Sequence, residues 1–170
     1  MNKFWGHLKT ITHHRHLVMR GCFRMGLIWQ GLTHDLSKYS PTEFLAGVRY
    51  YQGDRSPNTA EREANGYSLA WMHHKGRNRH HFEYWTDLSP KTRTYEPVDM
   101  PVRYLCEMVA DRIAACKTYQ GAAYTDASPL AYLDRARESS CVNPATFRQL
   151  HFLLEMLRDH GEEETFRFIR

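Results

Sequence analysis

The histidines of this chain are concentrated in its first half, where they form three groups. The chain has eleven histidines, and nine of them precede residue 82. The groups are His13, His14 and His16, then His34 beside Asp35, and then His73, His74, His80 and His81. Because imidazole is the commonest side-chain metal ligand, this clustering predicts a metal site.

The His34–Asp35 pair lies in the segment GLTHDLSKYSP and is followed by Lys38. Adjacent residues on a helix project about 100° apart, yet both can hold one ion, or the carboxylate can bridge two ions. Lys38 shares their helix face and could contact a phosphate oxygen beside the metal. The alternative is an ordinary helix end, with Asp35 solvated and Lys38 placed favourably against the helix dipole.

A third candidate is Asp111, which shares an apolar helix stripe with Tyr104, Met108 and Ala115 at steps of three and four. A buried carboxylate is costly unless it is paired or bound to a metal. The alternative is that Asp111 faces outward and pairs with Arg112 or Arg103. Glu107, one turn before Asp111, could orient a ligand, act as a base or pair with Arg103.

Helices must position these residues, because strand-like alternation is scarce and helix start signals recur. His7, Ile11, His14, Val18 and Cys22 recur at steps of four, three, four and four, which predicts one buried face of a helix over 3–20. We expect Gly21 and Gly26 to bend or interrupt this helix, and a second apolar run, 23–36, ends at the His34–Asp35 pair. The pattern therefore predicts an all-α fold that turns His14 towards the core.

Capping signals place the remaining helices. In the SPTE motif we expect Ser40 as N-cap, with the Glu43 side chain reaching back to it as in a capping box. We expect a helix from 58 towards 74, an irregular connection over 85–100 and a helix over 101–118. Two C-terminal helices begin at Ser128-Pro129 and Asn143-Pro144, and the apolar stripe of the last one is expected to end at Gly161.

Size and composition limit the class of protein. The 170 residues fit one domain, and 42% of them are apolar. We expect no signal peptide and no membrane span, because no run reaches about 18 apolar residues. The four cysteines contain no CxxC pair, so a reducing cytoplasm is expected. The net charge of +4 mildly favours anionic ligands but is too small and dispersed to indicate nucleic-acid binding.

The ordered set of His14, His34-Asp35, a histidine-rich segment and an aspartate in EMVADRIAA resembles the HD-superfamily metal-dependent phosphohydrolases. Their signature is H…HD…D on an all-helical scaffold. HDLSK is similar to their frequent HD-x-G-K, with Ser37 where glycine is usual. The segments HDLSKYSPTEF and HHKGRNRHHFEYW look closest to a small bacterial and phage family of unknown function near the HD group. The resemblance spans residues 8–120, and 121–170 add helices without a motif.

The resemblance implies a single HD-like helical domain over 1–170 and a metal-dependent phosphohydrolase. Its substrate would be a nucleotide or another small phosphate ester. The implied ligands of one metal are His14, His34, Asp35 and Asp111, and those of a second, with Asp35 bridging, are His74, His80 and His81. His13 or His16 could replace His14, and the choice among His73, His74, His80 and His81 stays open.

The remaining roles belong to the hypothesis of phosphate-ester hydrolysis. Asp35, Lys38 and Glu107 would serve catalysis, and Lys38, Arg77 and Arg79 would neutralise phosphate oxygens. One or two ions of Mn, Fe, Co, Ni or Zn suit a mixed histidine and carboxylate site. Two alternatives stay open: a di-iron oxygenase of the HD type, and a metal-stapled helical module that binds a partner or nucleotide without turnover.

Overall fold

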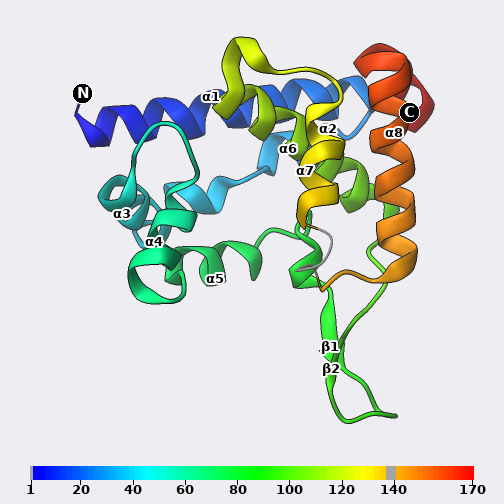
Figure 1. Ribbon diagram of the computed structural model, residues 1–170, viewed down its shortest axis with the longest axis horizontal. Coiled ribbons are helices and arrows are strands. Elements are labelled where there is room, and N and C mark those ends of the chain that lie inside the picture. Colours follow the sequence, from blue (N-terminus) through cyan, green and yellow to red (C-terminus); the bar gives the residue numbers. More distant parts are fainter. Residues whose placement is uncertain (1, 137–140) are drawn as a thin grey trace.

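The computed structural model describes residues 2–136 and 141–170, which form a helical body with one projecting hairpin (Figure 1). The prediction of an all-α single domain is confirmed. The α-helices are α1 (Lys3–Arg24), α2 (Ile28–Thr33), α3 (Pro41–Tyr50), α4 (Pro57–Asn65), α5 (Leu69–Lys75), α6 (Val102–Gln120), α7 (Ser128–Ala136) and α8 (Pro144–Ile169). Short 3-10 helices are η1 (Leu36–Tyr39), η2 (Phe82–Tyr84) and η3 (Gly121–Ala123), and the strands are β1 (Thr86–Leu88) and β2 (Tyr95–Pro97).

The core lies where α1, α6 and α8 pack together. The predicted face of α1 is confirmed as buried from His7 to Cys22. Val109 on α6 and Leu154 on α8 are fully buried in the same cluster as Val18 of α1. Burying one such side chain stabilises the fold by about 1.5–3 kcal/mol. The packing of α1 against α6 therefore holds these two helices in register. It also fixes the polar residues that lie on the same faces.

Glycines in left-handed conformations set two of the helix ends. Gly26, with φ of 79°, separates α1 from α2, in agreement with the expected interruption. Gly66, with φ of 81°, ends α4, and α5 begins afresh with Ser68 as its N-cap. The expectation of one helix from 58 to 74 was therefore wrong: the segment folds into two helices, because the glycine conformation at 66 turns the chain.

Other sequence expectations needed smaller corrections. The connection over 85–100 contains an antiparallel hairpin in which Thr86 lies opposite Pro97. At Gly161, φ of 77° and ψ of 174° kink α8, and helical structure resumes beyond it to Ile169. Ser40 is the N-cap of α3, as predicted, and accepts from the Glu43 amide. The Glu43 carboxylate turns away from this cap, so the predicted capping box is only half formed.

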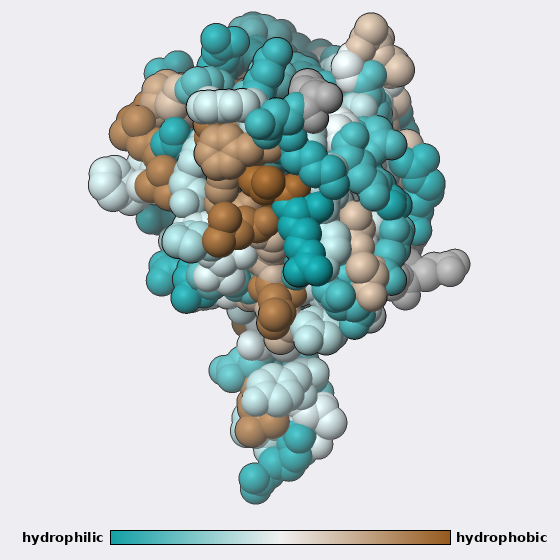
Figure 2. All heavy atoms as spheres, turned by 90° about the vertical axis from the view of Figure 1, so that its left-hand side faces the viewer, coloured by the Kyte–Doolittle hydropathy of each residue, from teal (hydrophilic) through white to brown (hydrophobic). Residues whose placement is uncertain are grey.

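The face formed by α3, α4 and α5 gathers apolar side chains, as Figure 2 shows from the N-terminal side. Leu45 and Leu69 are exposed there. They help line a groove of about 350 Å³ together with Arg49 and Glu61. None of the predicted metal ligands lines this groove. Within residues 2–136 and 141–170, none of the helices combines the length and the apolar character that a membrane span requires.

We predict that Gly47→Ala destabilises the protein although it lies inside α3. A Cβ atom at residue 47 would lie 2.1 Å from His7 Nε2, which is a severe overlap. Overpacking of this kind costs about 1–3 kcal/mol. In a His7→Ala background the overlap disappears, and Gly47→Ala should instead stabilise by up to about 1 kcal/mol through helix propensity. Urea unfolding of the four proteins measures this reversal of sign. Equal destabilisation in both backgrounds would contradict the contact.

Candidate metal centre

An unusual backbone conformation allows two adjacent residues to face one point. His34 follows the last residue of α2, and Asp35 has the left-handed φ of 55°. Aspartate tolerates this conformation better than most residues. The Arg15 guanidinium on α1 donates to the backbone carbonyls of Leu32 and His34, at 2.6 and 3.2 Å, and so ties the turn to α1. Asp35 is only 1% exposed, so the alternative of a solvated helix end is wrong.

The first group of converging side chains consists of His14, His34, Asp35 and Asp111. His14 Nε2 lies 3.0 Å from Asp111 Oδ1 and 3.6 Å from Asp35 Oδ2. His34 Nε2 lies 3.3 Å from Asp35 Oδ2 and 3.5 Å from Asp111 Oδ1. These four atoms come from α1, the turn after α2, and α6. The structure thus brings together all four residues predicted for the first position.

Two of the open choices in this group are resolved by burial. His14 is buried, whereas His13 and His16 on the same helix are exposed. Asp111 turns its carboxylate to His14 and His34 and is 15% exposed. The alternative of an outward Asp111 paired with a surface arginine is therefore wrong, because its oxygen is directed into the interior.

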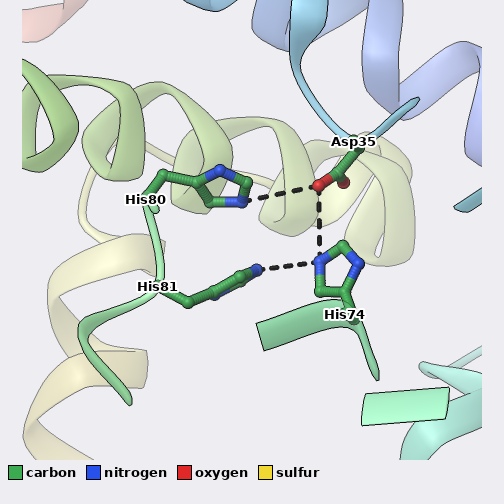
Figure 3. A group of neighbouring side chains, drawn as sticks. All are labelled: Asp35, His74, His80 and His81. Atoms are coloured by element: carbon green, nitrogen blue, oxygen red, sulfur yellow. Dashed lines mark hydrogen bonds and ion pairs between the residues drawn. The ribbon is translucent and has the colours of Figure 1, made fainter. Parts of the chain in front are cut away.

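The second group shares Asp35 with the first and adds His74, His80 and His81. Asp35 Oδ1 lies 3.3 Å from His74 Nε2 and 3.5 Å from His80 Nε2. His81 Nε2 lies 2.9 Å from His74 Nε2. Figure 3 shows the four side chains pointing towards one another, with His74 on α5 and the other two histidines on the loop that follows. Asp35 uses one oxygen for each group, which is the arrangement predicted for a bridging carboxylate.

Glu107 and Glu43 set which ring nitrogen of several histidines carries the proton. Glu107 Oε1 accepts from His34 Nδ1 at 2.9 Å and is 3.1 Å from His80 Nδ1. Burial would raise the pKa of Glu107, but its hydrogen bonds to both imidazoles lower it below the usual value, so Glu107 is a carboxylate that can only accept. The Nδ1 atoms therefore donate, and the Nε2 atoms of His34 and His80 face Asp35.

Glu43 performs the same task on the opposite side and was missed as a site residue. Glu43 Oε2 accepts from His74 Nδ1 at 2.7 Å, and Oε1 accepts from His73 Nδ1 at 2.6 Å. The cap motif SPTE explained Glu43 without any reference to histidine.

The polar atoms at the centre of the two groups are those that need a cation. His14 Nε2, His34 Nε2, His80 Nε2 and Asp35 Oδ1 are buried without a hydrogen-bond partner among the described residues, and Asp35 Oδ2 has the Lys38 ammonium at 2.5 Å. An unsatisfied buried polar group costs about 1–3 kcal/mol. Imidazole nitrogen and carboxylate oxygen together suit divalent metals. The residues present therefore fit a metal ion, and the two groups could each hold one.

The electrostatics of the two aspartates favour positive charge at this point. Burial would raise the pKa of Asp35, but His34 and Lys38 help to hold it well below its usual value. Burial would also raise the pKa of Asp111, but its close contact with His14 Nε2, at 3.0 Å, is the main cause that holds it well below its usual value. Both groups are therefore anionic over the whole physiological range.

The same carboxylates act on the histidines around them. Burial would lower the pKa of His34, but the charge of Asp35 and the bonds to Asp111 raise it well above its usual value. For His81, burial dominates and holds the pKa well below its usual value, so this imidazole is neutral. The centre thus attracts protons or a metal cation to the place where the Nε2 atoms converge.

Lys38 lies at the edge of the centre, with its Nζ 2.5 Å from Asp35 Oδ2. Its side chain is 26% exposed, in contrast to that of Asp35, so it connects the buried carboxylate with the solvent. The Ser37 hydroxyl accepts from Asn78 Nδ2 at 2.8 Å, which ties η1 to the loop that carries His80. The serine at this position, where the related motif has glycine, therefore has a structural contact.

Arg77 and Arg79 lie on the surface, and their described contacts are outside the two groups. Arg77 donates to the His73 carbonyl at 3.2 Å, and Arg79 donates to Tyr104 Oη at 3.1 Å. Their proposed part in phosphate binding stays a prediction. His73 contributes only through Glu43, so of the two doublets the structure brings His74, His80 and His81 into the second group.

We predict that a divalent transition metal raises the melting temperature of chelator-treated protein. Free metal at a hundred times its Kd stabilises by about 2.7 kcal/mol, which is roughly 5–10 °C for a domain of this size. Asp35→Asn should lose most of the shift, because Asp35 serves both groups. The matched control is Asp159→Asn, an exposed partner of Arg158 on α8. Thermal melts with and without metal measure the shift. The same shift in Asp35→Asn as in the control would contradict the centre.

Comparisons with known proteins place the chain in a family. Residues 3–158 match the model of a family of unknown function, DUF5662. This span includes all the residues of both histidine and aspartate groups. No curated protein and no solved structure matches the chain. Since the match covers most of its length, the chain belongs to the DUF5662 family.

Proposed function

We propose that this protein is a metal-dependent phosphohydrolase that acts on a nucleotide or another small phosphate ester. The observation that carries the proposal is the convergence of three buried Nε2 atoms and the Asp35 carboxylate on one place, with the Lys38 ammonium beside it. The Nε2 atoms and Asp35 Oδ1 have no hydrogen-bond partner among the described residues. The order of the ligands along the chain, His14, His34-Asp35 and Asp111, supports a relationship with the HD superfamily. That relationship is part of the proposal.

The donor atoms narrow the choice of metal. Three histidines and a shared aspartate in the second group, and two histidines with two aspartates in the first, favour Mn, Fe, Co, Ni or Zn over Mg or Ca. One or two ions would bind, with Asp35 common to both. A metal held here would polarise the phosphoryl group and lower the pKa of the attacking water.

The side chains of the protein have separate tasks in this proposal. Asp35 is the anchor of both positions, and Glu107 and Glu43 keep the Nε2 atoms directed at it. Lys38 Nζ, now on Asp35 Oδ2, can swing to a phosphate oxygen, because its side chain reaches the solvent. In hydrolysis water adds to phosphorus, the bond to the leaving oxygen breaks, and that oxygen takes up a proton. Lys38 would stabilise the charge that gathers on the phosphoryl oxygens.

A second candidate is a di-iron oxygenase, and the histidine-rich second group favours it. His74, His80 and His81 supply imidazole nitrogen, which suits iron. An iron EPR signal after aerobic purification, together with no release of phosphate in the assay below, would select this candidate. Tight metal binding with neither activity would select a metal-stapled binding module instead. The proposed compartment is the cytoplasm, and no part of the proposal involves nucleic acid.

We predict metal-dependent release of phosphate when the chelator-treated full chain is supplied with Mn²⁺, Fe²⁺, Co²⁺, Ni²⁺ or Zn²⁺. The substrates are a panel of nucleotides and a generic phosphate monoester. Asp35→Asn should lower the rate by at least roughly 100-fold, because it removes a ligand and its charge from both groups. Asp159→Asn should retain the wild-type rate. Absence of metal-dependent phosphate release from the wild type across this panel would overturn the proposal.

Lys38→Gln gives a second, independent prediction. Loss of one charge-stabilising donor should lower kcat by roughly 100-fold, while the metal content stays at the wild-type value. Lys91→Gln on the exposed hairpin is the matched control and should have no effect. Steady-state kinetics and elemental analysis are measured on the same samples. If Lys38→Gln lost its metal and its activity together, Lys38 would be a structural residue of the centre and not a contact to phosphate.

A further inference from the structure

Glu107 contacts one histidine from each of the two ligand groups. His34 belongs to the first group and His80 to the second, and both direct their Nδ1 atoms to the same oxygen, Glu107 Oε1. We propose that Glu107 is a positioning residue that couples the two metal positions, so that an ion at one prepares the other. This inference rests on the metal centre of the proposed function and goes beyond it, because it concerns how the two positions depend on each other.

The packing leaves the two imidazoles little freedom to move independently. Both His34 and His80 are 1% exposed, and their ring centroids lie 4.3 Å apart with an interplanar angle of 36°. Glu107 is 5% exposed on the inner face of α6. A shift of either ring towards a metal must therefore move the shared oxygen or the neighbouring ring. Fixing one ring fixes the other.

Glu43 provides a contrast within the same chain. It also accepts from two imidazoles, but with different oxygens, and of its partners only His74 belongs to a ligand group. His73, its other partner, is partly exposed and lies outside both groups. Glu43 therefore positions a ligand of the second group alone. The two buried carboxylates make similar hydrogen bonds, but Glu107 contacts ligands of both groups and Glu43 contacts a ligand of one.

The coupling predicts positive cooperativity. The first ion orders the histidine it binds, and through Glu107 it orders a histidine of the other position. The second ion then binds to a ligand that is already ordered, so less conformational entropy is lost. Coupling between sites typically changes affinity about 5–150-fold. We expect the second Co²⁺ ion to bind roughly tenfold more tightly than it would to an independent position.

The test is a titration of the chelator-treated full chain with Co²⁺, followed by calorimetry and by the visible absorption of the bound ion. The wild type should take up two equivalents cooperatively. In Glu107→Gln, which keeps an acceptor oxygen but loses the charge, both equivalents should weaken by at least roughly tenfold, and the cooperativity should disappear. In Glu43→Gln only one equivalent should weaken. Thermal melts of the metal-free variants show whether each is folded.

The outcomes separate this inference from the proposed function. Two independent equivalents in the wild type, or one equivalent alone, would overturn the coupling and leave a metal centre in place. Weakening of a single equivalent in Glu107→Gln would make Glu107 a local residue like Glu43 and would also overturn it. No Co²⁺ binding by the wild type would instead overturn the metal centre itself. If Glu107→Gln does not fold, Glu107→Asp takes its place, because it keeps the charge but withdraws it from both imidazoles. Cooperativity in Glu107→Asp equal to that of the wild type would overturn the coupling through Glu107.

Discussion

The structure depends on one buried carboxylate, that of Asp35. It is almost fully enclosed, it adopts a left-handed backbone conformation, and each of its oxygens faces a different set of histidines. Moving a carboxylate out of water costs several kcal/mol unless positive charge or hydrogen bonds compensate. Around Asp35 the compensation from the chain is incomplete, because Lys38 pairs with Oδ2 while Oδ1 lacks a hydrogen-bond partner among the described residues. A cation at this place would therefore stabilise the folded protein as well as provide chemistry.

The helical frame makes such a costly arrangement stable. The long helices α1 and α6 pack together in an apolar core that includes Val18 and Val109, and this packing places His14 and Asp111 side by side. The turn that carries His34 is tied to α1 by Arg15, and the loop that carries His80 is tied to η1 through Asn78 and Ser37. Polar residues on otherwise apolar faces are thus held by packing that does not depend on them.

Two further carboxylates orient the histidine rings of the centre. Glu107 and Glu43 accept hydrogen bonds from Nδ1 atoms, and the Nε2 atoms of the same imidazoles are therefore directed towards Asp35. Such carboxylate–imidazole pairs fix the orientation of metal-binding histidines and increase their basicity. They occur on two different helices, α6 and α3, and reach the site from opposite sides. The specificity of the centre therefore resides as much in these acceptors as in the ligands that they orient.

The amino-acid sequence by itself determined the helical class and the residues that turn inward. The steps of three and four that join His14 to Val18 and Asp111 to Met108 are periodic, and periodicity is a local property that survives without knowledge of the fold. Local patterns did not identify Glu43 as a site residue, because a four-residue cap motif does not show whether its glutamate also accepts hydrogen bonds in the interior. Local patterns also predicted one helix where α4 and α5 form two, because an apolar pattern does not show the left-handed conformation of Gly66.

The tertiary structure decided which of the inward residues meet, and local periodicity could not. Only the resemblance to the HD superfamily had grouped His14, His34, Asp35 and Asp111 as one set beforehand. His14 and Asp111 are 97 positions apart along the chain, and no spacing rule relates segments at that separation. The pairing of α1 with α6, the left-handed turn at Asp35 and the placement of the loop after α5 select His14 over its neighbours and bring His74, His80 and His81 to one carboxylate. The choice arises from packing between distant elements, which depends on the shape of the whole core and is not encoded in any one of them.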